Sequence, residues 1–342
     1  MQRTTKRVRV RLLATGLAAA AIAATGAGVT TAAGSATSSV TTRDSLRAVH
    51  GVGAGSAAGP LSAAAGSAAR PVSAGRANAV PMPKNCGVLT TIVADRALRF
   101  GIIDGPTGQT VDAGLTLDFQ PRAATFVVSS TNRGITVRRL LATSTDGGLF
   151  LITLQDRLDA RTKQQITTST VARIGVGWGG VRLLVSSYPY VYGVNDAGAL
   201  KRYQMTRSWG IVSAGTVRHS GWAQVTSLSR GDLWNLGRNA RGQTRYGDDI
   251  VGVLSTGALR AYLIPRDNYQ SIAAFTLVSR GWGGFAHMSV GSCDAGSSRP
   301  LVAITKDGQA HAYLDRNGDD QRGTDIRWVG MLDRGWTGLL AD

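Results

Sequence analysis

The residues best suited to bind a ligand in this sequence form one short run of polar and aromatic side chains. Asp267, Asn268 and Tyr269 are consecutive and together offer hydrogen-bond acceptors, a donor and an apolar ring face. A sugar needs this combination, because its hydroxyls require polar partners and its C–H face requires an apolar one. The same stretch also has the composition of a turn, since Pro265 and Arg266 precede Asp267 and Asn268. Both interpretations stay open at this point.

A second set of aromatic residues recurs along the chain. Gly-Trp pairs place Trp178, Trp222, Trp282 and Trp336 at intervals of 44, 60 and 54 residues. Recurrence at a period near fifty indicates a repeated structural unit, whereas a catalytic motif usually occurs once. These rings either fill space between units or stack on a sugar. In one unit Ile135 stands where the opening Trp is expected, which favours packing, because Ile fills volume but cannot stack.

Metal and catalytic patterns are weak in this chain. Asp315, Asn317 and Asp319 alternate within 314–325 as calcium ligands do, but the glycine is at 318 and no Glu follows at the twelfth place. A polar hairpin loop fits these letters better. The four His are not at metal-ligand spacings, and GxSxG, HExxH and CxxC are absent. We therefore expect no enzyme and no cofactor.

One unit carries an extra stretch, residues 232–248. It contains Trp234, Arg238, Arg241, Arg245 and Tyr246, a set that could form a basic and aromatic contact surface. The alternative is a loop without a binding role.

The first residues have the layout of an export signal. Five cations precede an apolar run of 13 residues, Leu12–Ala24, which is shorter than the roughly 20 residues of a transmembrane helix. We predict a signal peptide over 1–33, no membrane span, and a secreted, extracellular protein. Cleavage would change the net charge from +17 to 17 − 5 = +12, because 1–33 contains no acid.

The basic charge suggests which polymers the chain could meet. No basic run with interleaved aromatics follows residue 11, so we expect no nucleic-acid partner. A basic exported protein could adhere to anionic cell-wall polymers, and the alternative is an ordinary solvated surface.

The chain divides into a low-complexity part and a folded part. Residues 34–85 are rich in Ala, Gly and Ser and have almost no bulky apolar residue, which predicts a disordered linker or pro-segment. From Cys86 to residue 342, short β-branched runs alternate with turn residues and no long helical period occurs. This part is expected to be one all-β domain.

The Gly-Trp pairs align this domain into repeated units. Three of these units read as four strands whose middle hairpin turns at a Gly, with Tyr203, Tyr262 and Tyr313 five positions after that Gly. The first unit, assigned to 88–134, lacks its opening strand, and the apolar segment 338–342 follows the last Gly-Trp pair. A C-terminal strand that completes the first unit closes a ring and removes sheet edges. We therefore predict a five-bladed β-propeller of four-stranded blades, closed by the C-terminal strand.

The order of Gly-Trp, apolar strand, Gly-turn hairpin with Tyr, and a second Gly-Trp resembles the tachylectin-2-like β-propeller lectins over 86–342. The resemblance implies carbohydrate binding, with sites for N-acetylated amino sugars between neighbouring blades. The family's Asp-Asn-aromatic stretch matches Asp267, Asn268 and Tyr269, and it decays to Trp209 in one unit and Trp328 in another. We infer a secreted lectin-like propeller; the alternatives are a protein-binding scaffold propeller or, third, an enzyme.

The two cysteines are expected to form a disulfide. An isolated pair in an exported chain is typical of a disulfide. The unit alignment puts Cys293 after the first strand of the last unit and Cys86 just before the second strand of the first unit. In a closed ring these two loops are neighbours on one face. Two separate buried thiols are the alternative.

Overall fold

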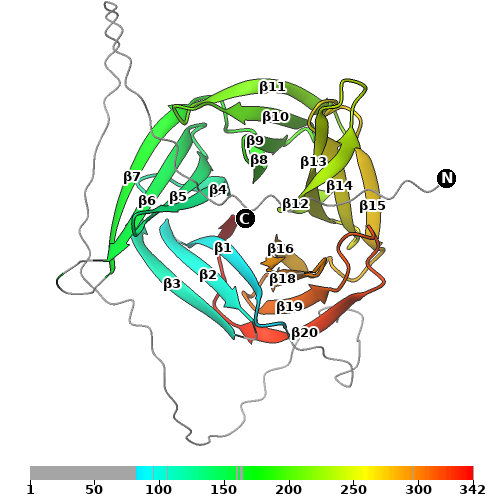
Figure 1. Cartoon of the computed structure of the whole chain (residues 1–342). Helices are drawn as coiled ribbons and strands as arrows, with labels where there is room; N and C mark the ends of the chain where they lie inside the picture. The colour runs from blue at the N-terminus through cyan, green and yellow to red at the C-terminus, as the bar shows by residue number, and fades with distance from the viewer. Residues whose placement is uncertain are drawn as a thin grey trace, which may run out of the picture.

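A computed structural model describes residues 82–341 except 95, 106, 159–160, 162–164 and 295. The described chain is all β and forms five antiparallel sheets around a central axis (Figure 1). The predicted five-bladed β-propeller is therefore confirmed. The predicted signal peptide, 1–33, and the linker, 34–85 apart from its last four residues, lie outside the described residues.

Each blade has four strands in sheet order. Blade 1 consists of β21 (Leu339–Ala341), β1 (Cys86–Ala94), β2 (Ala97–Asp104) and β3 (Thr107–Thr116), and the short β17 (Ser292–Cys293) also pairs with β1. Blade 2 consists of β4 (Pro121–Asn132), β5 (Ile135–Ser144), β6 (Leu149–Leu158) and β7 (Gln165–Gly175). Blade 3 consists of β8 (Val181–Ser187), β9 (Tyr190–Asn195), β10 (Leu200–Met205) and β11 (Ile211–Arg218). Blade 4 consists of β12 (Val225–Arg238), β13 (Thr244–Leu254), β14 (Leu259–Pro265) and β15 (Ala273–Val278). Blade 5 consists of β16 (Phe285–Val290), β18 (Arg299–Thr305), β19 (Ala310–Asp315) and β20 (Ile326–Asp333).

The ring closes through the predicted C-terminal strand. β21 runs antiparallel to β1, with Leu339, Leu340 and Ala341 opposite Val93, Ile92 and Thr91. In Figure 1 the dark red β21 lies near the axis, inside β1. The extent predicted for this blade was wrong: it ends at Thr116, and β4 is already the innermost strand of blade 2.

The same shift corrects the assignment of Ile135. This residue begins β5 and is 40% exposed, so it does not take the place of an opening Trp. Leu117 takes that place. Its N–H donates to the Arg96 carbonyl at 2.8 Å, as the Trp178 N–H donates to the Gly147 carbonyl at 3.0 Å. Blade 2 therefore has a fully buried Leu at this position. Because the repeats were aligned on their Gly-Trp pairs, the start of blade 2 could not be located from the sequence.

Each opening Trp packs against the blade that it begins. The ring centroids of Trp178 and Tyr203 are 4.4 Å apart, those of Trp222 and Tyr262 are 4.5 Å apart, and those of Trp282 and Tyr313 are 4.9 Å apart. Blade 1 has Gly101 in the place of the Tyr, and a Cβ on Gly101 would lie 2.6 Å from ring carbons of Trp336. Burial of these rings at four of the five junctions is the packing that the repeats predict.

The antiparallel order gives the ring two distinct faces. Loops between first and second strands, and between third and fourth strands, lie on one face. We call it the disulfide face, because it carries Cys86 and Cys293. The second-to-third-strand turns and the Gly-Trp loops lie on the opposite face, which we call the Gly-Trp face.

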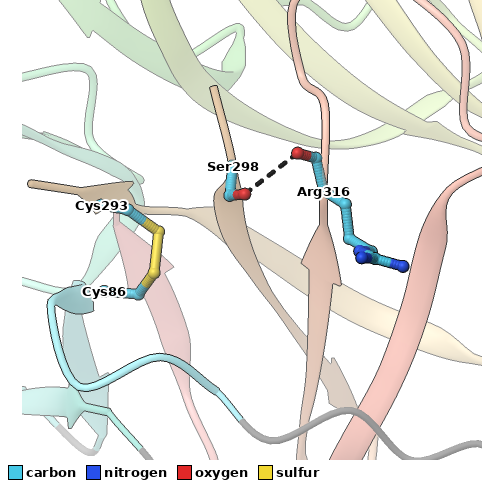
Figure 2. The surroundings of a disulfide bond; sticks show 4 residues. All are labelled: Cys86, Cys293, Ser298 and Arg316. Carbon is cyan, nitrogen blue, oxygen red and sulfur yellow. Dashed lines mark hydrogen bonds between the residues drawn. A yellow bond between two sulfur atoms is a disulfide. The ribbon is translucent and has the colours of Figure 1, made fainter. Parts of the chain in front are cut away.

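The predicted disulfide is present. Cys86 and Cys293 are bonded and stand opposite each other in the β1–β17 pair, with Cα atoms 3.9 Å apart (Figure 2). In blade 5 the Ser298 hydroxyl donates to the Arg316 carbonyl at 3.0 Å, which ties the start of β18 to the end of β19. The bond joins blade 5 to blade 1 at the joint that β21 also closes.

Candidate functional site

The run Asp267–Tyr269 forms the loop between β14 and β15 on the disulfide face. The Ser271 N–H donates to the Asn268 carbonyl at 3.0 Å, so the stretch is a turn. Asp267 and Asn268 are exposed on it, and Tyr269 is half-buried. The turn interpretation and the ligand interpretation are thus compatible, because the turn presents the polar side chains to solvent.

An arginine from the neighbouring hairpin orients the Asp267 carboxylate. The Nε of Arg245, on β13, lies 2.5 Å from Asp267 Oδ2, and its second nitrogen lies 3.3 Å from Oδ1. The hydrogen bond from Arg245 lowers the pKa of Asp267. Both side chains are well exposed, so this ion pair contributes little to stability. Its effect is to hold a charged donor and a charged acceptor beside the Tyr269 loop.

Tyr269 lies at the joint between blades 3 and 4. The guanidinium of Arg202, on β10, lies 3.9 Å from the centroid of the Tyr269 ring and 4.5 Å from that of Tyr190. One Arg202 nitrogen donates to the Arg266 carbonyl at 3.0 Å. An arginine at this distance over aromatic rings is attracted to their π-faces. We call Tyr190, Arg202, Arg266 and Tyr269 the Arg202 cluster.

A buried carboxylate forms the floor of the Arg202 cluster. Asp248 is fully buried and accepts hydrogen bonds from Ser187 Oγ at 2.7 Å, the Tyr192 hydroxyl at 2.6 Å and Arg266 Nε at 2.8 Å. Burial raises the pKa of Tyr192, so this hydroxyl stays a donor. Because these partners come from both blades, the network fixes the two walls of the joint relative to each other.

The joint between blades 2 and 3 also has an aromatic ring on an arginine. Trp209, in the β10–β11 loop, occupies in blade 3 the place of Tyr269 in blade 4. The guanidinium of Arg139, on β5, lies 3.9 Å from its ring centroid, and the Tyr188 ring lies 5.9 Å away. Two neighbouring joints therefore each place a half-buried aromatic ring on an arginine of the preceding blade.

The other predicted aromatic residues do not join these clusters. Trp328 lies on β20 opposite Tyr313 in register and is half-buried in the blade 4–5 core. The four opening tryptophans are on the Gly-Trp side and are nearly buried: Trp178 7%, Trp222 5%, Trp282 5% and Trp336 1% exposed. Their burial agrees with the packing interpretation.

The 314–325 segment uses its first carboxylate within the protein. Arg299 is buried between Asp315, at 2.7 Å, and Asp249 of blade 4, at 2.8 Å. Burial raises the pKa of Asp315, and the charge of Arg299 opposes this rise. In the described part of the chain, no group of three or more His, Cys, Asp or Glu side chains could hold a metal ion.

Residues 232–248 extend β12 and β13 into a long hairpin on the disulfide face. Trp234 is 5% exposed, so its ring belongs to the core rather than to a contact surface. Arg238 and Arg241 are exposed near the tip, and Arg245 holds Asp267. The five residues predicted as one surface are therefore divided: Trp234 lies in the core, Arg238 and Arg241 lie near the tip, Arg245 pairs with Asp267, and Tyr246 is half-buried on β13.

A pocket of about 570 Å³ opens on the disulfide face near the axis. Its lining comes from blades 1, 2, 4 and 5, and includes Leu89, Phe126, Arg230, Asp232 and Val290. The pocket exists because β21 covers β1 only at Thr91–Val93, while the other blades have inner strands of six residues or more. We call it the axial pocket.

Sequence reasoning missed Arg202, Arg139, Arg266, Asp248 and the axial pocket. Arg139 and Arg202 are isolated arginines within strands and belong to no sequence motif. Their aromatic partners lie some 60–70 residues away, one blade later. Only the blade-to-blade register brings such residues together.

Comparison with known proteins assigns the chain to no family and finds only distant structural matches. No family model and no curated protein matches the chain. Among solved structures, PorZ, an essential bacterial surface component of the type-IX secretion system of Porphyromonas gingivalis, is similar at 12% identity and a TM-score of 0.33 over 73% of this chain. The match spans 28% of PorZ. The computationally designed Ika8 protein matches at 10% identity and a TM-score of 0.28, over 76% of this chain and 92% of Ika8.

No helix among the described residues is long and apolar enough to cross a membrane. On the evidence of its own strands, the chain is a five-bladed β-propeller whose ring is closed by a C-terminal strand and a disulfide.

Proposed function

We propose that this propeller is an exported carbohydrate-binding protein that recognises N-acetylated amino sugars or cell-surface polysaccharide on its disulfide face. The observation that carries the proposal is that two neighbouring joints each have an aromatic ring on an arginine: Tyr269 on Arg202 and Trp209 on Arg139. A ring that is fixed by a guanidinium and still partly exposed can receive the C–H face of a sugar. The resemblance to the tachylectin-2-like propellers supports the same ligand class.

The site at blades 3 and 4 is the more complete of the two. Beside Tyr269 it has Asp267, Asn268 and Arg245, which supply acceptors and donors for hydroxyl and acetamido groups. The site at blades 2 and 3 has Trp209, Arg139 and the exposed Tyr188. We therefore expect two sugar sites rather than five.

Export is the second part of the proposal. The disulfide supports an oxidising compartment, since such bonds persist there and are rare in the cytosol. A basic surface in that compartment supports adhesion to anionic wall polymers.

Sugar titration of four variants tests the proposal. N-acetylglucosamine and its oligomers are titrated by calorimetry into the purified protein and into Tyr269→Ala, Trp209→Ala, Tyr269→Phe and Met331→Ala. We expect each aromatic-to-Ala change to remove one of two sites, or to weaken it at least tenfold, about 1.4 kcal/mol. Tyr269→Phe keeps the ring and should keep binding. Met331 is an exposed residue of blade 5, so its variant should bind like the native protein.

Two results would contradict the lectin proposal. One is no heat of binding with any acetamido sugar, together with a blank glycan array. The other is native affinity and stoichiometry in the Tyr269→Ala and Trp209→Ala double variant.

A further inference from the structure

The inner edge of β1 has an uncovered segment that faces the axial pocket. β17 pairs with this edge at Cys86 and Gly87, and β21 pairs with it at Thr91–Val93. Between them no described strand lies opposite Val88–Thr90 on that edge. An uncovered strand edge presents N–H and C=O groups that can pair with another chain.

The backbone groups of Leu89 are the ones that point into the pocket. The Gly105 N–H donates to the Cys86 carbonyl at 2.9 Å, so Cys86 faces β2. Peptide groups of an antiparallel strand alternate between its two edges. Val88 and Thr90 therefore also face β2, and Leu89 faces the axis. Leu89 lines the pocket, together with Gly87 and Val88.

The length of the uncovered segment limits what can pair with it. Three residues of strand span about 10 Å. β17 and β21 occupy the same edge on either side of this segment. A strand that continued past the pocket would collide with one of them, so the geometry suits the end of a chain. The apolar side chains Phe126, Ile102 and Val290 would contact the first residues of such a chain.

The charges around the pocket select which end of a chain fits. Among the described residues its lining has three acids, Asp104, Asp232 and Asp294, and two cations, Lys84 and Arg230, a net charge of 2 − 3 = −1. The whole chain has 38 cations and 21 acids, so this negative balance is opposite to that of the protein. A positive group is favoured in such a site.

We propose that the axial pocket binds the free amino terminus of an extended peptide, whose backbone pairs with Leu89 between β17 and β21. Main-chain pairing supplies affinity for any sequence, and the acids supply selection for the α-ammonium group. This binding does not depend on the sugar sites, which lie outside the pocket at the joints of blades 2, 3 and 4.

The probe is a mixture of randomised tetrapeptide amides with free α-amino groups, and the matched probe is the same mixture after N-acetylation. Each is selected on the immobilised protein, and bound peptides are identified by mass spectrometry. We expect enrichment from the free-amine mixture and at least a tenfold loss of affinity on acetylation of any selected peptide.

Variants locate the binding. Ser292→Trp places a bulky ring on an exposed residue of the pocket lining and should abolish binding. Ser213→Trp is the matched control, because Ser213 is also an exposed serine on a strand but lies on β11, outside the pocket. The double variant Asp104→Asn with Asp294→Asn should weaken binding about tenfold. Both acids are exposed, so these changes should leave the fold intact, which circular dichroism checks.

Four outcomes would overturn the proposal: equal enrichment of the acetylated mixture, no enrichment of either mixture, native affinity in Ser292→Trp, or displacement of the peptide by N-acetylglucosamine. The last result would assign the pocket to sugars. Failure of the sugar titrations at Tyr269 and Trp209 would leave peptide binding unaffected.

Discussion

Replacing both Cys86 and Cys293 with Ala should destabilise the propeller strongly. The two residues are 207 positions apart in the sequence, so the bond closes most of the domain into one loop in the unfolded chain. For a loop of that size the chain-entropy relation gives about 18 cal/mol/K, or about 5 kcal/mol at 25 °C. The native pairing of β21 with β1 does not reduce this value, because the entropy is lost from the unfolded chain, where β21 is unpaired.

Urea unfolding followed by tryptophan fluorescence measures this effect. The variant should show a lower midpoint, and a slightly larger slope with urea, because the unbridged chain exposes more surface when it unfolds. In a thermal scan the loss corresponds to a fall of about 10–20 °C. The native protein under reducing conditions is the control, since it lacks the bond but keeps both side chains.

A loss below about 1 kcal/mol would refute the entropic reasoning. It would mean that the unfolded chain is already compact around this joint, so that the bond removes little freedom from it.

Three further predictions concern the core and the ring. Deleting 338–342 removes the partner of β1 at Thr91–Val93, and urea unfolding should show a loss of several kcal/mol, because the ring opens; a melting temperature within a degree or two of the full chain would contradict the closure. Gly101→Ala puts a Cβ 2.6 Å from the Trp336 ring and should cost about 1–3 kcal/mol, whereas Gly330→Ala, which has no neighbour within 4 Å, should be nearly neutral; equal effects would be inconsistent with this contact. Burial lowers the pKa of His287 to about 4, so the unfolded chain binds more protons than the folded chain between about pH 6.5 and 4. The free energy of unfolding should therefore fall by up to about 3 kcal/mol as the pH is lowered through that window. In a series of unfolding measurements at different pH, His287→Gln should flatten this part of the curve, and an unchanged slope would argue against the assignment.

The blade count could be predicted because its signals are local. A Gly at the hairpin turn of blades 2 to 5, such as Gly198 with a φ of 74°, takes a conformation that few other residues adopt, and in blade 1 Arg96 takes it. The Tyr five positions later then meets the opening Trp of the same blade. Both residues lie within one blade of sequence, so their spacing is visible without a structure.

Blade 2 shows why the register failed there. Leu117 and Ile152 occupy the places of the Trp and the Tyr, and both lie in one core cluster. Two aliphatic side chains fill a volume similar to that of the aromatic pair, but Leu and Ile are common residues, so they give no recognisable repeat motif in the sequence. The alignment therefore settled on Ile135, one strand too late.

The binding residues could be predicted only in part. Asp267, Asn268 and Tyr269 are adjacent, so their combined chemistry is visible in the sequence. Their arginine partners depend on how one blade packs on the next, and no pattern within a blade encodes that contact. The axial pocket is harder still to foresee, because it results from three residues of β1 that no strand in the described part of the chain covers.

The closure in blade 1 has a consequence for the time order of folding. Blades 2, 3, 4 and 5 each consist of strands that are contiguous in sequence, so each can form as soon as its own residues are available. Blade 1 needs β21, which comes some 250 residues after β1. Its first three strands must therefore wait through the synthesis of the four other blades with an exposed inner edge.

An open edge during that interval invites pairing with other chains. The oxidation of Cys86 with Cys293 becomes available once β17 has been made, before β21 exists. Such a bond would hold blade 5 beside blade 1 before the ring is closed, so that β21 would be made close to its partner β1. The disulfide would then shorten the time during which the inner edge of β1 is unpaired, which is the most aggregation-prone stage in the maturation of the protein.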